Sequence, residues 1–545
     1  MSSLAAPYTP RKPTETVLYA AVRDGLETFL RWTRETYDRP LPRYVERELR
    51  AYLRCGVFAH GFLRAHCDEC GNDLLVAFSC KGRGICPSCA GRRMANTAAH
   101  LVDRVLPVVP VRQWVLSLPH ELRRLAAFDA RALTAFDRIF VEQILAHHRR
   151  VAGRNGLVGA RGGAVTFVQR FGGSLNLHVH FHVVVLDGAF ERRASGAVFH
   201  EAPPPTSLEL DEILHRTATR IARWLRRHDR QEIAERVETS ALDACADAAT
   251  HPGVFAKLTD DTDHETDDTA PPTSRLVASC SGFNLHAGVR MSASDDVGRE
   301  RLCRYGARPA LASKNLRRLP DGRFAYRTKY ARRGQAHHRI MTPMELLARL
   351  AALIPPPRHP LVRYHGVLAP HSAWRAHVVP RAPADSPPPP PPHHIPTARR
   401  DCAPVAATAP ASNTRPLHTA DHGPPAPSPA AATSSPCPSS LSSVHTRDTA
   451  VLLTPNILAV AHWSRIAQGL LRASSPRINW PTLLRRTFTI DVLRCPRCSG
   501  SLHVLAALTN PETVHALLEH LDISTPPAPA RARDPTDLLD PLLDS

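Results

Sequence analysis

The sequence predicts an α+β protein with an antiparallel main sheet, and three observations carry this prediction. An alternating, β-branched run from Leu177 to Leu186 follows a second apolar run from Ala164 to Phe171. The short turn Gly172-Gly173-Ser174 separates them, which is typical of a hairpin. Segments with apolar residues at helical spacing precede and follow this hairpin. We therefore expect a sheet with helices on one face.

The first 110 residues are expected to form helices and a metal-binding domain, over residues 15–110. Glu15 to Thr36 and Tyr44 to Arg54 have helical patterns, and prolines separate them. Two Cys-x-x-Cys pairs, fifteen residues apart, then flank a short predicted strand, Leu74 to Phe78. This spacing is typical of a four-cysteine zinc ribbon held by Cys67, Cys70, Cys86 and Cys89.

Basic side chains surround the predicted zinc ribbon, namely Lys81, Arg83, Arg92 and Arg93. They favour a ribbon that presents cations to DNA, although a purely structural zinc staple explains the cysteines equally well. Cys80 lies between the two pairs as a spare thiol that could pack or substitute for a ligand.

Residues 111–375 are expected to form the central domain. The predicted strands are 111–118, 164–171, 177–186, 275–281, 283–289, 323–330 and 337–341. The predicted helices are 94–105, 122–150, 208–237, 295–305 and 342–353, the last opened by a Thr342 cap and Pro343. The acidic, Thr-rich stretch 260–269 is expected to be a loop.

The C-terminal third divides into three predicted parts. Residues 376–448 are rich in Pro, Ala and Ser and cannot bury enough apolar surface to order, which predicts a disordered linker. Residues 449–523 are expected to form a small module, followed by a loose tail over 524–545. Cys495 and Cys498 form a single pair with no second pair nearby in sequence, so we interpret them as a half-site or a relic.

Histidine alternates along the predicted strand at positions 178, 180 and 182, which places three imidazoles on one face. Burying them is costly unless they bind something, and neutral imidazole is the commonest metal ligand. Centring the hairpin near Ser174 places Gln169 opposite His180. A metal held there could activate water or polarise a phosphodiester.

The net charge of +19 and the pI of about 9.9 indicate a polyanionic partner, most simply nucleic acid. An Arg-rich composition inherited from a GC-rich genome is the alternative explanation. No apolar stretch has the length of a membrane span, and the first residues lack an apolar signal core. We therefore expect a cytoplasmic protein without a membrane partner, whose thirteen cysteines serve as metal ligands or buried thiols.

Tyr305, at the end of a predicted helix, is a candidate nucleophile for attack on a phosphodiester. Arg301, Arg304 and Arg308 surround it and would attract phosphate and favour phenolate. The alternative is a tyrosine that merely packs.

Several of these motifs together resemble the HUH-type transposases of the insertion-sequence-91 family, to which the ISCR elements also belong. They include Asn176, His180-Phe181-His182 and Leu186-Asp187-Gly188. Others are the cysteine segment from Phe78 to Met94, Gln113 to Pro119, Leu302 to Tyr305 with Arg308-Pro309-Ala310, Pro343 to Leu353, His365 to Pro370 and Asp491 to Cys495. The resemblance covers residues 15–375 and a patch near 480–520.

The resemblance implies rolling-circle chemistry on single-stranded DNA at element ends and target, in a nucleoid-associated prokaryotic protein. His180, His182 and one further polar side chain would hold Mg²⁺ or Mn²⁺, and Tyr305 would form a 5′-phosphotyrosine link. The third ligand is Gln169 by hairpin geometry, with Glu300 as the alternative.

Two positions depart from the family pattern. Some relatives carry a second tyrosine four residues before the position of Tyr305, where this chain has Arg301, so a single-tyrosine enzyme is expected. Tyr326 and Tyr330 have the same spacing but lie in a predicted strand, and we interpret them as structural. The position of His178 is not always histidine in relatives, so we do not expect His178 to be a metal ligand. Rival interpretations are an inactive DNA-binding relic with a zinc ribbon, and a metal-dependent hydrolase in which Tyr305 is incidental.

Overall fold

The central sheet has six antiparallel strands in the order β14-β5-β6-β4-β10-β9. The computed structural model describes residues 6–194, 196–228, 240–250, 276–328, 338–380, 480–488, 490–525, 527 and 530–533. The six strands are β4 (Val111–Ser117), β5 (Gly163–Phe171), β6 (Leu177–Leu186), β9 (Val277–Cys280), β10 (Phe283–Met291) and β14 (Val362–Gly366). The histidine strand, β6, therefore has a neighbour on each side and every one of its residues is buried.

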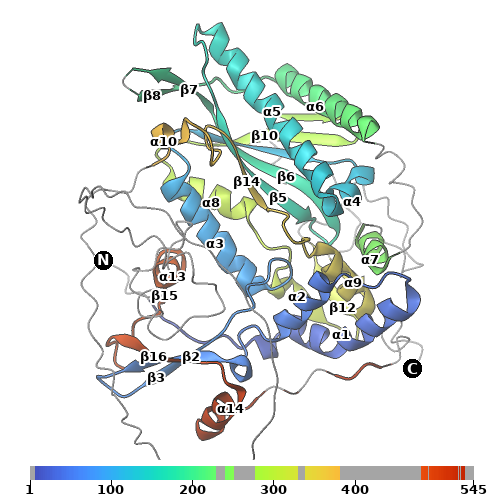
Figure 1. Cartoon of the computed structure of the whole chain (residues 1–545), viewed down its shortest axis with the longest axis vertical. Helices are drawn as coiled ribbons and strands as arrows, with labels where there is room; N and C mark the ends of the chain where they lie inside the picture. Colours follow the sequence, from blue (N-terminus) through green and yellow to red (C-terminus); the bar gives the residue numbers. More distant parts are fainter. Residues whose placement is uncertain are drawn as a thin grey trace, which may run out of the picture. The chain divides into compact units, whose positions relative to one another are not determined.

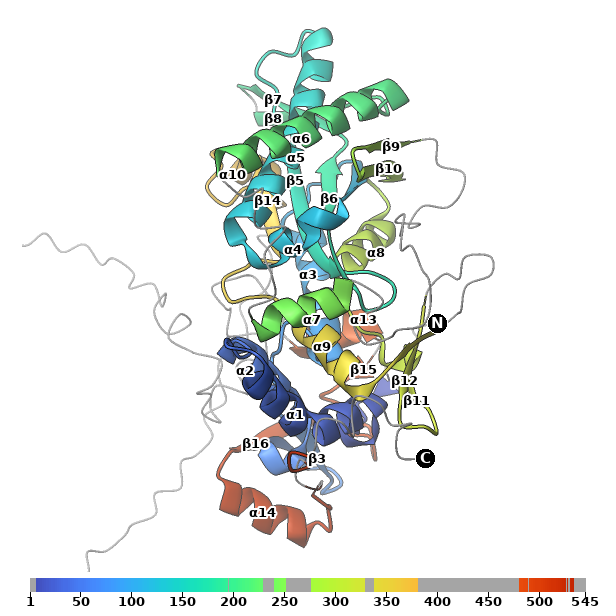
Figure 2. The ribbon, with the colours of Figure 1, turned by 90° about the vertical axis from the view of Figure 1, so that its right-hand side faces the viewer.

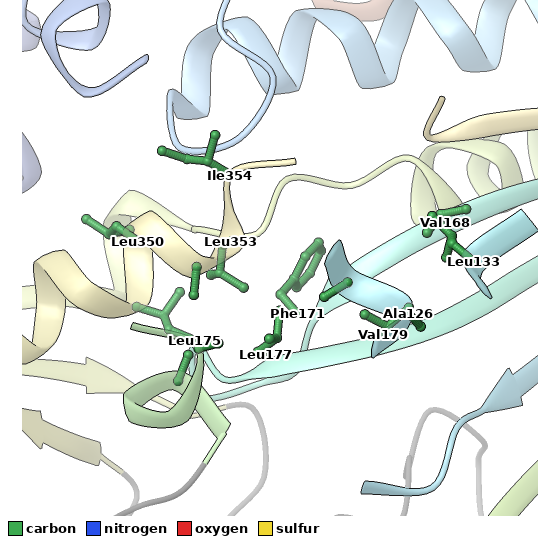
Figure 3. Packing of buried hydrophobic residues seen from close by; sticks show 14 of the residues in the cluster. Ala126, Leu133, Val168, Phe171, Leu175, Leu177, Val179, Leu350, Leu353 and Ile354 are labelled. Carbon is green, nitrogen blue, oxygen red and sulfur yellow. The ribbon is translucent and has the colours of Figure 1, made fainter. Parts of the chain in front are cut away.

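One face of the sheet packs against four helices, α4 (His120–Phe128), α5 (Ala130–Arg154), α6 (Ser207–Arg227) and α7 (Ala241–Thr250). The odd-numbered residues Val179, Phe181 and Val183 of β6 point into this core. Figure 3 shows Val179 beside Ala126 of α4, and Leu177 and Leu353 of α9 (Pro343–Leu353) close to Phe171. Burial of these side chains supplies most of the stabilisation of the sheet.

The opposite face of the sheet, which carries the histidines, is covered by α3 (Pro87–Arg104) and α8 (Asp296–Gly306). Leu101 of α3 and Leu302 and Cys303 of α8 pack against Phe167 and Val184. Figure 1 shows α5 and α6 on one side of the strands and α3 and α8 on the other. The expectation of helices on a single face is therefore wrong, because the histidine face also carries apolar residues that need cover, namely Val184 and Leu186 of β6 and Val165 and Phe167 of β5.

The N-terminal region has two helices and a three-stranded sheet. The helices are α1 (Val17–Thr36) and α2 (Arg43–Leu53), and the sheet has the order β16-β2-β3. Its strands are β2 (Phe62–Cys67), β3 (Asp73–Ala77) and β16 (Leu502–Leu508). Figure 2 shows the C-terminal β16 and α14 (Pro511–His520) in the same region as β3, and β16 pairs directly with β2. The C-terminal module thus completes the sheet of the N-terminal region.

The remaining described elements are short or peripheral. They are β1 (Ala6–Pro7), η1 (Pro13–Glu15), η2 (Phe58–His60), β7 (Gly188–Arg193), β8 (Gly196–Glu201), η4 (Ser313–Asn315), β11 (Leu316–Arg318), β12 (Phe324–Arg327), β13 (His338–Met341), α10 (Arg375–Val378), α13 (Trp480–Phe488) and β15 (Ile490–Asp491). No helix among the described residues combines the length and the apolar character that crossing a membrane requires.

Local sequence signals explain where the main helices begin. Thr342 accepts a hydrogen bond from the backbone N–H of Glu345, and Pro343 occupies the first turn of α9, as the sequence predicts. Asp295 caps α8 by accepting from the Gly298 N–H at 2.7 Å. Such caps satisfy backbone donors that have no partner within the helix.

Some predicted boundaries differ from the structure. Helix α3 begins at Pro87 and not at Met94, because Pro87 fits the first turn and Cys86 takes the cap position. The sequence patterns miss β2, β7, β8 and β14, which are short strands with polar side chains, and they also miss the mostly apolar β16. Residues 229–239, the 260–269 loop, Tyr330, nearly all of the 376–448 linker and most of the 524–545 tail lie outside the described residues.

Candidate functional site

The three histidines of β6 lie in rows that cross the central sheet. His180 is opposite Gln169 of β5 and Ser117 of β4, and His182 lies between Phe167 and Val115. Residues directly opposite one another point to the same face of a sheet. The predicted pairing of Gln169 with His180 is therefore confirmed, and both side chains point to the face covered by α8.

Burial and hydrogen bonds hold the imidazoles in place. His178, His180 and His182 are 3%, 2% and 0% exposed. The ring centroid of His180 lies 4.9 Å from that of each of the other two. His180 Nδ1 lies 3.0 Å from the His178 carbonyl oxygen. Burial and the neighbouring cationic groups lower the pKa of His178 well below its usual value, so this ring is neutral.

Gln113 of β4 is a neighbour of the histidines that the search for site residues overlooked. Its side-chain amide lies 2.8 Å from His182 Nδ1 and is itself buried. A polar group bound to one ring nitrogen orients an imidazole whose other nitrogen binds a metal. The alternation of β4 would have revealed it, since Gln113 lies on the same face as Val115 and Ser117.

Tyr305 comes from α8 and its ring contacts the histidine strand. The ring centroid lies 5.3 Å from that of His182, and the two rings are nearly perpendicular. Leu302 and Cys303, one turn earlier, anchor the helix in the core over the same sheet face. The structure thus brings the predicted nucleophile and the predicted metal-binding strand together, although a long stretch of chain separates them.

Gln169 connects the sheet to the C-terminal end of α8. Its side-chain Nε2 donates to the carbonyl oxygens of Tyr305 and Gly306 at 2.8 and 2.9 Å. Its Oε1 accepts from Arg308 Nε at 3.2 Å. The Tyr305 carbonyl also accepts from the Arg308 N–H at 3.4 Å, whereas the Gly306 carbonyl lies at the very end of the helix. Together the bonds from Gln169 fix the height of Tyr305 above the sheet.

The arginines that surround Tyr305 have different environments. The Arg308 guanidinium lies 4.8 Å from the Tyr305 ring centroid and 5.3 Å from that of Phe171. Arg301 is exposed, and Arg304 forms an ion pair with Glu300 at 2.5 Å. Of the three, Arg308 is the one that contacts the tyrosine ring.

Glu300, the alternative metal ligand, is engaged elsewhere. Its Oε1 pairs with Arg304, and its Oε2 lies 2.7 Å from Arg486 of α13. Among the described residues, the groups of three or more His, Cys, Asp or Glu ligand atoms within 4.8 Å of one another are two cysteine clusters. Among these residues, the three imidazoles do not form such a group.

The predicted set of four zinc ligands is divided between two clusters. Cys86 and Cys89 join Cys55 and Cys80, whereas Cys67 and Cys70 join Cys495 and Cys498. The grouping of Cys67, Cys70, Cys86 and Cys89 around one ion is therefore wrong, and Cys80 is not a spare thiol. Sequence spacing missed this because Cys55 stands alone at the end of α2 and the partners of Cys67 lie more than 400 residues away.

The first cluster, Cys55, Cys80, Cys86 and Cys89, lies where three segments meet. Cys55 follows α2, Cys80 precedes a tight turn at Lys81 with φ of 56°, and Cys86 caps α3. Neighbouring sulfur atoms lie 3.5–3.7 Å apart. Four thiolates around one Zn²⁺ at about 2.3 Å lie about 3.8 Å apart, so the cluster fits a single zinc ion.

The basic residues predicted to contact DNA near the cysteines divide into two groups. Lys81 and Arg92 are exposed, and Arg93 donates to the Lys81 carbonyl at 3.1 Å. Burial and the neighbouring Arg92 lower the pKa of Lys81. Arg83, by contrast, donates to the His359 carbonyl and so supports the fold. The exposed members alone are placed to meet a polyanion.

Tyr326 has the structural role that its strand position predicts. It is buried in β12, and its hydroxyl accepts from the Ala312 N–H at 3.3 Å. The Asp187-Gly188 pair likewise supports the fold. Asp187 receives two hydrogen bonds of 2.9 Å from Arg112, and a Cβ on Gly188 would lie 2.1 Å from the His200 carbonyl oxygen.

Comparison with known proteins gives two family matches. Residues 163–375, which include β6 and α8, match a family model described as "Putative transposase". Residues 26–118, which include all six N-terminal cysteines, match the IS91 model described as "Transposase zinc-binding domain". No curated protein and no solved structure matches this chain. The two matches, in the order that the sequence motifs predict, show that this zinc-binding chain belongs to the IS91-like family of transposases.

Proposed function

We propose that this transposase nicks and rejoins single-stranded DNA at element ends through Tyr305, in rolling-circle transposition. Its family implies DNA as the partner and a DNA-processing reaction. The observation that carries the finer proposal is the contact of the Tyr305 ring with His182, which brings a phenol to a face lined by imidazoles.

In the proposed step, the Tyr305 oxygen attacks the scissile phosphorus. A phosphotyrosine bond forms to the 5′ side of the downstream strand, and the bond to the 3′ oxygen of the upstream strand breaks. The phenol proton leaves to water, and the 3′ oxygen gains a proton from water. Rejoining reverses this step with the 3′-hydroxyl of a second strand, so the energy of the phosphodiester is conserved.

His180, His182 and the Gln169 amide oxygen would hold Mg²⁺ or Mn²⁺, which supplies charge neutralisation at the scissile phosphate. Gln113 Nε2 lies 2.8 Å from His182 Nδ1, and an amide nitrogen donates. With Nε2 of His182 used for the metal, its proton would lie on Nδ1, and the Gln113 amide would turn by 180° to accept it through Oε1. Arg308 holds the tyrosine ring by stacking, and the exposed Arg301, Lys81 and Arg92 attract the DNA backbone. Cys55, Cys80, Cys86 and Cys89 would hold a structural zinc ion.

The proposal is tested with single-stranded oligonucleotides from the element ends, the full-length chain and Mn²⁺. DNA labelled at its 3′ end should migrate with the protein on a denaturing gel, and DNA labelled at its 5′ end should yield a shorter fragment that a polymerase can extend. Tyr305→Phe should abolish the adduct, whereas the matched control Tyr326→Phe should retain it. His180→Ala should remove cleavage and spare DNA binding.

Each other outcome would indicate a different activity for this protein. Cleavage without an adduct in the wild type would indicate a hydrolase that uses activated water. DNA binding without any cleavage would indicate a catalytically inactive DNA-binding relic. An adduct that persists in Tyr305→Phe would reject the assignment of the nucleophile.

A further inference from the structure

The second cysteine cluster joins the two ends of the described chain. Cys67 and Cys70 follow β2, whereas Cys495 and Cys498 precede β16. The C-terminal pair lies outside both segments that match family models. Half of this site therefore lies outside the segment that matches the zinc-binding domain.

The two pairs have the same backbone conformation. The N–H of Cys67 donates to the carbonyl of Asn72, five residues later, and the N–H of Gly71 donates back to the Cys67 carbonyl. The N–H of Cys495 donates in the same way to Gly500, and that of Ser499 donates back to Cys495. Both residues at the fourth position are left-handed, with φ of 68° for Gly71 and 66° for Ser499.

A left-handed backbone conformation is uncommon for serine, so the conformation of Ser499 indicates that its surroundings impose it. This turn places the two sulfur atoms of a Cys-x-x-Cys pair on the same side. Backbone N–H groups also point at the C-terminal thiols, from Arg497 to Cys495 Sγ at 3.4 Å and from Gly500 to Cys498 Sγ at 3.3 Å. Such donors stabilise thiolates, the form that binds metal.

The sulfur atoms have the spacing of ligands to one ion. Cys67 Sγ lies 3.4 Å from Cys498 Sγ, and Cys70 Sγ lies 3.5 Å from Cys495 Sγ. All four sulfur atoms lie within 4.8 Å of one another. A tetrahedral Zn²⁺ with four thiolates requires about 3.8 Å between sulfurs, and closed four-cysteine sites are structural.

The surrounding contacts bring the two pairs together from opposite ends of the sequence. β16 pairs antiparallel with β2, with Leu502 opposite Cys67. Ala65, Leu74 and Leu502 form a small core with Cys67 and Cys495. A second small core joins α14 to the same sheet through Phe62, Leu75, Val514 and Leu518. Both cores are small, which is the situation in which small domains rely on metals.

We propose that Cys67, Cys70, Cys495 and Cys498 form a second structural zinc site, which attaches the segment from 490 to 523 to the N-terminal domain. The chain then forms a closed loop between residues 70 and 495, with the predicted Pro-rich linker inside it. Cys498 is exposed and Cys70 partly so, whereas three of the four thiols of the first cluster are buried. The second ion therefore exchanges with a chelator before the first.

The test begins with metal analysis of the full-length chain purified under reducing conditions without chelator. The wild type should contain about two zinc ions per chain. A variant with Cys495→Ser and Cys498→Ser should contain about one. The control Cys280→Ser, which changes a cysteine outside both clusters, should retain the wild-type zinc content. Cobalt substitution should give thiolate charge-transfer absorbance that falls by about half in the double variant.

A second measurement tests whether the metal attaches the C-terminal segment to the N-terminal domain. A protease site inserted between residues 400 and 450 allows the folded chain to be cut. The two fragments should remain together on a sizing column, and a chelator should separate them. In the double variant they should separate without chelator.

Three results would overturn the proposal. They are one zinc ion in the wild type, an unchanged zinc content in the double variant, and wild-type fragments that stay together after the metal is removed. A disulfide between Cys67 and Cys498 in protein purified under reducing conditions would overturn the proposal as well. All these readouts are independent of DNA cleavage, so they hold whether or not Tyr305 is the nucleophile.

Discussion

Replacing Gln169 by glutamate separates two roles that this side chain can have. The amide donates to two carbonyls of α8 through Nε2, and its Oε1 accepts from Arg308 and is the proposed metal ligand. Gln169→Glu keeps an oxygen for the metal and for Arg308. It replaces the donor with a charged oxygen that faces the carbonyl oxygens of Tyr305 and Gly306.

The size of the expected loss in rate follows from the two lost hydrogen bonds. Each contributes about 1 kcal/mol, and leaving a carbonyl without its donor adds to the loss, so the end of α8 is destabilised by about 2–3 kcal/mol. Since about 1.4 kcal/mol is a factor of ten in rate, adduct formation should slow by about 30- to 150-fold. The Mn²⁺ concentration needed for half-maximal rate should not rise, because a carboxylate oxygen, which binds divalent cations more tightly than an amide oxygen, takes the place of the ligand.

The assay is single-turnover adduct formation over a series of Mn²⁺ concentrations, with Gln143→Glu as the control. Gln143 is also a buried glutamine, but it lies on α5, so its variant reports the general cost of a buried carboxylate. A Gln169→Glu enzyme that matches the wild type in rate would refute the reasoning, since the amide would then not position Tyr305.

Three further predictions concern residues that stabilise the fold around the candidate site. Asp187→Ala leaves the buried Arg112 without its carboxylate and should lower the free energy of unfolding by about 3–5 kcal/mol in urea titrations. Glu15→Ala, in the exposed ion pair with Lys12, should cost less than about 1 kcal/mol, and equal losses would contradict this prediction. Gly306→Ala places a Cβ 2.6 Å from the Phe167 ring and should cost about 1–3 kcal/mol and impair adduct formation, whereas Gly153→Ala has open space and should do neither. Burial and the neighbouring His147 lower the pKa of His148 to about 4, so the unfolded chain binds the extra proton first as the pH falls. Stability should therefore decline by about 3 kcal/mol between pH 6.5 and pH 4 on account of this group, and His148→Phe, which cannot titrate, should lose less over that window.

Strand alternation and turn chemistry were sufficient to predict the site hairpin down to its register. Gln169 lies opposite His180 because a short Gly-Gly-Ser turn and one buried face leave few other pairings. The α8 helix and its tyrosine were predicted as well, since they depend on neighbouring residues. The cover on the histidine face was not predicted, because α3 and α8 reach it through contacts distant in sequence.

The sequence by itself was sufficient to identify the candidate functional groups of this protein. They are the histidines in strand alternation, the tyrosine among arginines, and the cysteines in pairs. Those signals are local, because side-chain direction in a strand and the turn within a Cys-x-x-Cys pair depend on a few adjacent residues. Only the tertiary structure decided which residues meet. It placed Tyr305 against His182 and gave Cys67 and Cys70 partners near the C-terminus, since β16 adds to the free edge of β2 and spacing along the chain carries no information about that pairing.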